Sequence, residues 1–269
     1  MALTRPSSRI VTALDRLLIP GDVLMTVRAT TRGHSLLVDR GARLSYETAG
    51  SGSTPILFVS GAVPASRVFR PQLTYFDGST TVRALALDLR EPDRSAGYPD
   101  PPPARRRAQD LDEIVRHLDL REIVLVGWSG GVTDALGYVR EFGCERLRAL
   151  VLVDWGPRAA SLRPEAGWTS VITSAGVPIA DDETDYVPDL IALDAIVPML
   201  FTVPDVLREI VAEWADTHTP SAYVVGIDRP ASPRRPPIEL CSLLERFLSI
   251  LPDGARHRVR IGLRLGGRV

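Results

Sequence analysis

The sequence of 269 residues contains no lysine, so all 32 of the residues counted as lysine or arginine are arginine. This absence excludes mechanisms that need a lysine amine, such as Schiff-base catalysis. Proline and alanine are frequent, and we interpret the whole bias as the coding preference of a GC-rich genome. The net charge is only −1, which gives no reason to expect nucleic acid or an anionic membrane as a partner.

Cysteine is scarce as well, because Cys144 and Cys241 are the only two and lie far apart in the sequence. Two distant cysteines make neither a disulfide framework nor a metal-ligand spacing, and a reducing cytoplasm fits them best. No phosphate-binding loop or dinucleotide fingerprint occurs either. We therefore expect a cytoplasmic protein without metal or cofactor.

Long hydrophobic runs are also missing. The apolar patches in residues 1–28 are broken by arginine, aspartate and proline, so we expect neither a signal peptide nor a membrane span. The overall composition, 45% hydrophobic and 24% charged, is that of an ordinary globular protein. One α/β domain with an insertion is the simplest partition of such a chain.

The most informative stretch lies in the middle of the chain. Four branched apolar residues, 123–126, run into Gly127-Trp128-Ser129-Gly130-Gly131, and residues 132–142 follow with helical spacing. This order predicts a strand, a sharp turn and a helix. At such a turn the serine is strained and exposed beside a helix N-terminus, and the outer glycines leave space that a Cβ would fill.

The stretch resembles the nucleophile elbow of the α/β-hydrolases, and the resemblance runs from about Leu36 to Pro157. It implies a mostly parallel twisted sheet flanked by helices, with Ser129 as nucleophile. It also implies an oxyanion hole formed by the backbone N–H groups of Ala62 and Gly130. Both tryptophans near the turns, Trp128 and Trp155, are candidate substrate contacts.

Two further motifs of the family occur in altered form. Ser60-Gly61-Ala62 stands where the family usually has His-Gly, and a backbone donor tolerates this change of side chain. Asp88, Arg90 and Ser95 are what remains of an Asp-x-Arg-Gly-x-Gly-x-Ser pattern after the predicted strand at 82–89. We expect Asp88 to brace loops and to take no direct part in chemistry.

The acid and the base are less well defined. Asp154 follows the predicted sixth strand, residues 147–153, at the active-site edge of such a sheet. Asp228 lies in the best match to the seventh strand, residues 221–230, and both acids stay open. His257 is the candidate base because it follows Asp228 at an interval similar to that of the family.

The other three histidines have weaker claims. His34 and His117 precede the elbow and are expected to face away from it, and His218 lies at the end of a predicted cap. Without a base within hydrogen-bond reach, the serine hydroxyl is a poor nucleophile at neutral pH.

Four regions follow from this interpretation: an N-terminal extension (1–34), the first part of the hydrolase core (35–157), a helical cap (158–219) and the C-terminal part of the core (220–269). In an alternative alignment, residues 215–235 still belong to the cap and the seventh strand is missing. The expected eighth strand and its histidine would lie near the C-terminus. The last forty residues match the family's pattern poorly, as if the tail were truncated or altered relative to the family.

Three functions are compatible with these features. The first is a serine hydrolase that cleaves an ester or related acyl bond of a small apolar substrate. The second keeps the fold without a full triad, and either binds a hydrophobic small molecule or catalyses a cyclase, lyase or isomerase reaction. The third is an interaction protein that uses an amphipathic N-terminal helix at residues 8–19.

Overall fold

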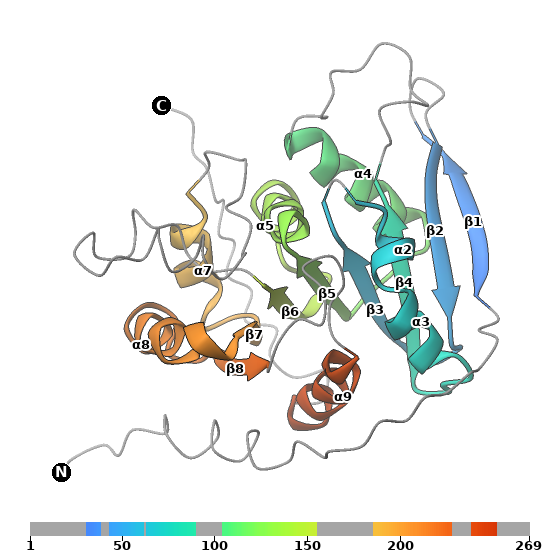
Figure 1. The fold of residues 1–269 in the computed structure, drawn as a ribbon. Helices are drawn as coiled ribbons and strands as arrows, with labels where there is room; N and C mark the ends of the chain where they lie inside the picture. Colours follow the sequence, from blue (N-terminus) through green and yellow to red (C-terminus); the bar gives the residue numbers. More distant parts are fainter. Residues whose placement is uncertain are drawn as a thin grey trace, which may run out of the picture.

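The computed structural model describes residues 31–38, 43–61, 63–89, 104–154, 185–227 and 238–251. These residues form an eight-stranded sheet in the order β1-β2-β4-β3-β5-β6-β7-β8 (Figure 1). The first two pairs, β1 with β2 and β2 with β4, are antiparallel, and all later pairs are parallel. The mostly parallel α/β architecture predicted from the sequence is therefore confirmed. The strands are β1 (Arg32–Leu37), β2 (Arg43–Ala49), β3 (Thr54–Val59), β4 (Val82–Asp88), β5 (Ile123–Trp128), β6 (Leu147–Val153), β7 (Met199–Pro204) and β8 (Tyr223–Ile227).

Helices cover both faces of this sheet (Figure 1). One face carries α2 (Ala65–Val68), α3 (Arg70–Phe76) and α9 (Glu239–Ile250), whose apolar side chains share a buried cluster with the strands. The other face carries α4 (Ala104–His117), α5 (Gly130–Phe142), α7 (Val187–Leu193) and α8 (Arg208–His218), and η4 (Asp205–Leu207) leads into α8. The central strands are buried on both sides, which explains their continuous apolar sequences.

Strand β5 shows how the two cores divide. Val124, Val126 and Trp128 belong to the cluster under α3 and α9, while Ile123 and Leu125 belong to the cluster under α4 and α5. This alternation is the ordinary period of two in a strand. It places the Trp128 ring on the α9 face, directly before Ser129.

The C-terminal third differs from the predicted arrangement. Strand β7 lies inside residues 158–219, the range predicted to be a helical cap, and the segment predicted as the seventh strand is β8. The alternative that placed residues 215–235 in the cap is wrong too, because β8 pairs with β7 in the sheet. The misassignment arose because a short apolar run such as Met199–Pro204 does not distinguish a buried strand from a buried helix. The eighth strand predicted near the C-terminus and the helix predicted at 8–19 lie outside the described residues.

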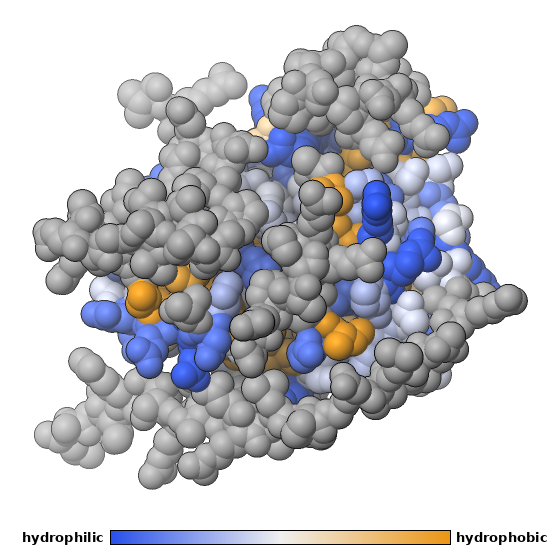
Figure 2. All heavy atoms as spheres, viewed as in Figure 1, coloured by the Kyte–Doolittle hydropathy of each residue, from blue (hydrophilic) through white to orange (hydrophobic). Residues whose placement is uncertain are grey.

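The surface carries its large exposed apolar side chains at separate places. On the face drawn in Figure 2, the described surface is mainly hydrophilic, with hydrophobic side chains in small groups. The most exposed members come from β1, the loop after β3, α3, α7 and both ends of α9: Leu37, Val63, Tyr75, Ile191, Ile238 and Ile250. Scattered apolar residues of this kind are normal on globular proteins.

Helices α4 and α5 are joined by two arginine–carboxylate pairs of different burial. Arg107 Nε lies 2.5 Å from Asp134 Oδ1, and the Asp134 side chain is fully buried. Arg105 and Glu141 make a similar pair at 2.9 Å, but the Arg105 side chain is 74% exposed. The two pairs therefore separate the effect of burial from the effect of the contact itself.

We expect Asp134→Ala to lower the free energy of unfolding by about 3 kcal/mol, because it leaves the partly buried Arg107 cation without this carboxylate. Glu141→Ala is the control, and its effect should stay below about 1 kcal/mol because the exposed pair is screened by water. Urea denaturation of both variants measures the difference. Equal losses in the two variants would contradict this account.

Candidate active site

Ser129 occupies the sharp turn between β5 and α5. Its backbone angles are φ 54° and ψ −122°, a combination that residues other than glycine rarely adopt. Such strain persists only where the surroundings enforce it, and it concentrates at functional sites. The strand, turn and helix predicted around this serine are confirmed.

The surroundings that enforce the turn are backbone atoms packed at very short range. A Cβ added to Gly131 would lie 2.2 Å from the carbonyl oxygen of Val59, at the end of β3. A Cβ added to Gly127 would lie 2.7 Å from the carbonyl oxygen of Gly131. Both glycines are therefore required by close approach, as the sequence predicted. Gly130 differs, because its added Cβ would meet only an ordinary contact at 3.6 Å.

The loop after β3 lies against the first turn of α5. Gly61 has φ +72°, and a Cβ there would lie 2.9 Å from the carbonyl carbon of Gly130. Ser60, the residue that replaces the family's histidine, donates its hydroxyl to the carbonyl oxygen of Val63. Ala62 lies outside the described residues, so its role as an oxyanion donor stays a prediction. The Gly130 N–H belongs to the first turn of α5, where N–H groups lack partners within the helix.

Asp154 stands beside Ser129 at the same edge of the sheet. Trp128 of β5 is in register with Val153 of β6, so the serine and the aspartate follow neighbouring strand ends. The Ser129 N–H donates to the carbonyl oxygen of Val153 at 3.0 Å. Asp154 also has a positive φ, 53°, which makes two adjacent strained residues at this edge.

The Asp154 carboxyl is held by the indole of Trp128. The Trp128 Nε1–H donates to Asp154 Oδ2 at 2.8 Å, and the tryptophan is only 4% exposed. Burial raises the pKa of Asp154 above its ordinary value, and the indole hydrogen bond opposes part of that rise. Contact of Trp128 with a substrate stays a prediction, as does that of Trp155, which lies outside the described residues.

A third acid at this edge was missed in the sequence. Asp205 follows β7 directly, in η4, and its side chain lies beside β8, because a Cβ on Gly226 would lie 2.3 Å from Asp205 Oδ1. The Arg208 Nε lies 3.4 Å from the same oxygen. An acid after the seventh strand is what the family resemblance implies, and the misplaced strand hid it. The signal was the apolar run of residues 199–203 ending in Pro-Asp. Asp228 lies outside the described residues.

The described histidines all lie away from the elbow. His34 is on β1, four strand positions from β5, or about 19 Å at ordinary strand spacing, and its ring stacks on Tyr46. His117 ends α4, and His218 ends α8 with its Nδ1–H donating to the carbonyl oxygen of Trp214 at 2.9 Å. Both helices lead into the amino ends of strands, which is the edge opposite Ser129.

The corrected strand order also changes where His257 falls in the family's order of strands and helices. The family resemblance implies a histidine between the eighth strand and the final helix. Here that segment runs from residue 228 to 237, reads DRPASPRRPP and contains no histidine. His257 comes after α9 in sequence and lies outside the described residues. No residue in the described ranges is therefore placed to act as the histidine of a triad.

Other nucleophiles and metal sites find no support in the described ranges. Burial raises the pKa of the Cys144 and Cys241 thiols, so neither is readily ionised to the reactive thiolate. Within these ranges, no three His, Cys, Asp or Glu side chains lie together as a metal would require. The same ranges contain no helix with the length and apolar character of a membrane span. Ser129 is thus the candidate nucleophile.

Comparison with known proteins gives a consistent result. A sequence profile described as the alpha/beta hydrolase family matches residues 56–259. An α/β hydrolase from Novosphingobium aromaticivorans superposes with a TM-score of 0.60 at 18% identity, covering 83% of this chain and 99% of that one. An esterase from Rhodococcus sp. ECU1013 gives 0.58 at 17% identity, covering 83% and 100%. A haloalkane dehalogenase from Agrobacterium tumefaciens gives 0.58 at 16% identity, covering 82% and 97%. At these identities the structures share the fold alone.

The packing of the elbow predicts a contrast between two adjacent glycines. Gly131→Ala should lower the free energy of unfolding by about 2 kcal/mol or more, because its Cβ meets the Val59 backbone, which cannot give way easily. Gly130→Ala should be close to neutral. Thermal denaturation of both variants measures this, and a Gly131→Ala variant as stable as wild type would contradict the close packing of Gly131 on Val59.

The burial of Asp154 predicts a pH-dependent effect of its removal. The folded protein holds the Asp154 proton to higher pH than the unfolded chain does, so wild-type stability falls as pH rises from the ordinary value of 3.8 through the raised pKa. Asp154→Asn removes this loss and keeps an acceptor for the Trp128 indole. Its stability relative to wild type should therefore increase from pH 4 upward, as measured by urea denaturation.

Asp119→Asn is the matched control for this series. Hydrogen bonds from Arg121 and Arg146 lower the pKa of Asp119 in the folded protein, so its contribution to stability is complete once the pH is well above the ordinary value of 3.8. Its stability relative to wild type should stay flat there. A flat response from Asp154→Asn as well would contradict the buried carboxyl.

Proposed function

The chain belongs to the α/β-hydrolase family, and from this premise we propose that it is a serine hydrolase that cleaves an ester or related acyl bond of a small apolar substrate. The observation that supports this most is the strained Ser129 at the end of β5, against the first turn of α5. The similar protein from Rhodococcus is an esterase. Ester cleavage by a serine needs this combination of a nucleophile and N–H donors. We also propose a cytoplasmic location, since both cysteines are free thiols.

The first half of the reaction uses the elbow directly. The Ser129 Oγ attacks the substrate carbonyl carbon while its proton passes to a base, and the carbonyl oxygen becomes an oxyanion. The N–H groups of Gly130 and Ala62 stabilise that oxyanion, helped by the partial positive charge at the start of α5. The leaving alcohol then takes the proton from the base. In the second half, the base takes a proton from water as the water oxygen attacks the acyl carbon. The Ser129 oxygen then leaves and takes the proton from the base, which releases the acid.

The base and its acid are a separate part of the proposal. Three of the four histidines lie on described elements away from the elbow. We propose the fourth, His257, as the base. Asp154 and Asp228 are the acids predicted from the sequence, and Asp205 joins them because it follows β7. We propose that any cap is confined to the sequence between β6 and α7, which includes Trp155.

A second candidate function is favoured by one observation, the absence of histidine from residues 228–237. A hydrolase-like protein without a positioned base would bind a hydrophobic small molecule, or would steer a cyclase, lyase or isomerase reaction. In that case the elbow would survive as part of the pocket, and Ser129 would not be acylated. The two candidates therefore differ in the reactivity of one hydroxyl.

We expect a fluorophosphonate probe to form an adduct on Ser129 of the folded wild-type protein, located by mass spectrometry of the digested chain. Ser129→Ala should abolish the adduct and lower turnover of p-nitrophenyl esters by about 10³-fold or more. Glu141→Ala, which removes an exposed ion pair on α5 and no group of the proposed site, serves as the control. His257→Ala should react as slowly as Ser129→Ala if His257 is the base. If the wild-type protein stays unlabelled while circular dichroism shows that it is folded, the serine-hydrolase proposal is wrong and the second candidate is favoured.

A further inference from the structure

We infer that Asp88 is a positioning residue for the segment that follows β3, residues 60–66, which is a loop that ends in the first turn of α2, and thereby sets the reactivity of Ser129. This inference rests on the proposed serine-hydrolase function. The loop carries Gly61 and the proposed oxyanion donor Ala62. Asp88 itself lies at the end of β4, on a different strand, and is half-buried.

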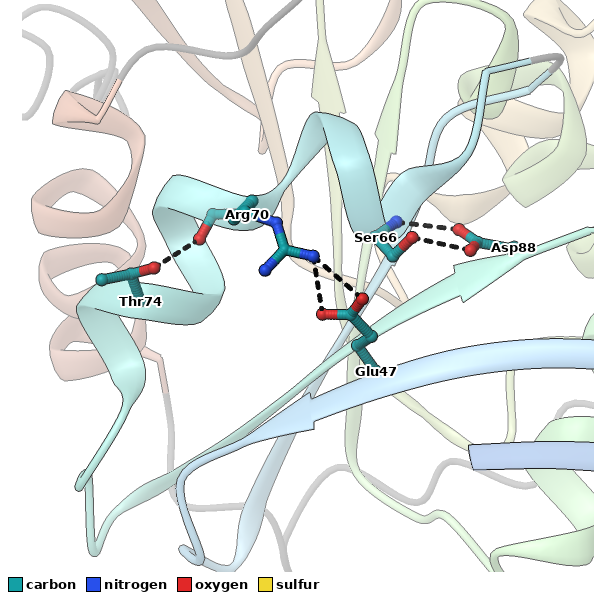
Figure 3. Close-up of polar contacts among 5 residues, drawn as sticks. All are labelled: Glu47, Ser66, Arg70, Thr74 and Asp88. Carbon is teal, nitrogen blue, oxygen red and sulfur yellow. Dashed lines mark hydrogen bonds and ion pairs between the residues drawn. The ribbon is translucent and has the colours of Figure 1, made fainter. Parts of the chain in front are cut away.

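The contact between Asp88 and the loop is bidentate. The Ser66 backbone N–H donates to Asp88 Oδ1 at 2.8 Å, and the Ser66 hydroxyl donates to Asp88 Oδ2 at 2.7 Å (Figure 3). Hydrogen bonds to an ionised carboxylate are shorter and stronger than those between neutral groups. The two together fix both the position of the Ser66 backbone and the orientation of its side chain.

Helix α2 depends on such an outside partner. It is a single turn of four residues whose N-cap is Pro64, a residue that offers no side-chain hydrogen bond. One turn of helix is unstable without tertiary contacts. Asp88 supplies from β4 the acceptor that an N-cap side chain supplies in most helices, so it fixes the point where the loop enters α2.

The other end of the loop is fixed against the elbow. Gly61 packs on the backbone of Gly130 and Gly131, and the Ser60 hydroxyl closes the turn onto the Val63 carbonyl oxygen. The chain from Ser60 to Ser66 is therefore held at its start by α5 and at its end by Asp88. Position 62 lies between these two anchors.

This arrangement matters because an oxyanion donor has a narrow working range. The N–H must lie about 2.7–3.1 Å from the developing oxyanion, and loss of one donor lowers the rate about 10²–10³-fold. A displacement of about 1 Å can cost about 100-fold. A loop released at Ser66 would lose one of its two anchors while the fold around it stayed intact.

The alternative is that apolar contacts alone hold α2. Val68 and Phe69 are buried, and the Phe69 ring stacks on Phe58 with centroids 4.5 Å apart. If these contacts suffice, removal of Asp88 would change stability and leave the elbow chemistry unchanged. The chemistry of Ser129, measured apart from stability, distinguishes the two explanations.

A second brace in the same view provides a matched control. The Arg70 guanidinium donates to Glu47 Oε1 at 3.0 Å and ties α3 to β2 (Figure 3). It is also a carboxylate on a strand that holds the helical segment after β3. It differs in acting beyond α2, on an arginine whose side chain is 55% exposed, and its hydrogen bonds join Arg70 to Glu47 and not to residues 60–66.

The experiment follows phosphonylation of Ser129 by a fluorophosphonate at several probe concentrations, which separates the maximal rate from the apparent affinity. Asp88→Ala should lower the maximal rate about 10- to 100-fold with little change in apparent affinity. Asp88→Asn should recover most of the rate, because its amide still accepts from the Ser66 N–H. Glu47→Ala should react like wild type, and melting temperatures are recorded for all variants.

The outcomes separate this inference from the proposed function. Failure of the wild-type protein to react overturns both. A reactive wild type with an equally fast Asp88→Ala variant, or with equal slowing in Asp88→Ala and Glu47→Ala, overturns the role of Asp88 alone. If Asp88→Ala does not fold, Ser66→Ala decides the question: it removes one of the two hydrogen bonds, and a several-fold lower maximal rate is expected, whereas a wild-type rate overturns the inference.

Discussion

The close approach of three backbone segments is the constraint on which the rest of the site depends. The end of β3, the turn at Ser129 and the first residues of α5 meet at distances that exclude a Cβ at Gly127 or Gly131. Because no side chain separates them, the serine, the start of α5 and the end of β3 pack backbone against backbone. The strain at Ser129 is thus enforced by packing on both sides.

Much of this group could be predicted from the sequence, because its features are local. The glycine spacing around Ser129, the apolar run before it and the helix after it each have a direct physical cause, and the structure has all three. The strand β7 could not be placed so easily. Its six residues are all buried and carry no alternation, and the proline-rich, acid-rich sequence before it suggested an insertion. One wrong strand then shifted the assignment of everything behind it, including the acid at Asp205.

The serine and its neighbouring acids lie at one edge of the sheet, and two of the histidines lie at the other. Ser129, Asp154 and Asp205 all follow the carboxyl ends of parallel strands, so topology alone gathers them at one edge. The histidines His117 and His218 end helices and are carried to the opposite edge by the same topology. Sequence reasoning could not settle this, because the edge on which a residue lies depends on whether a strand comes before or after it. The indole of Trp128 is another case, because its hydrogen bond to Asp154 joins two strands and leaves no signal in the sequence.

Helix α9 shows that folding and catalysis place separate demands on the C-terminal part of the sequence. It docks through buried side chains such as Leu240, Leu244 and Phe247, which share their cluster with side chains of the strands and of α2 and α3. The sequence between β8 and this helix contains no histidine, and the sheet, the elbow and the hydrophobic core are all formed. The buried core thus does not require a histidine in that segment. A formed nucleophile elbow and a complete set of catalytic groups are consequently separate properties of such a chain.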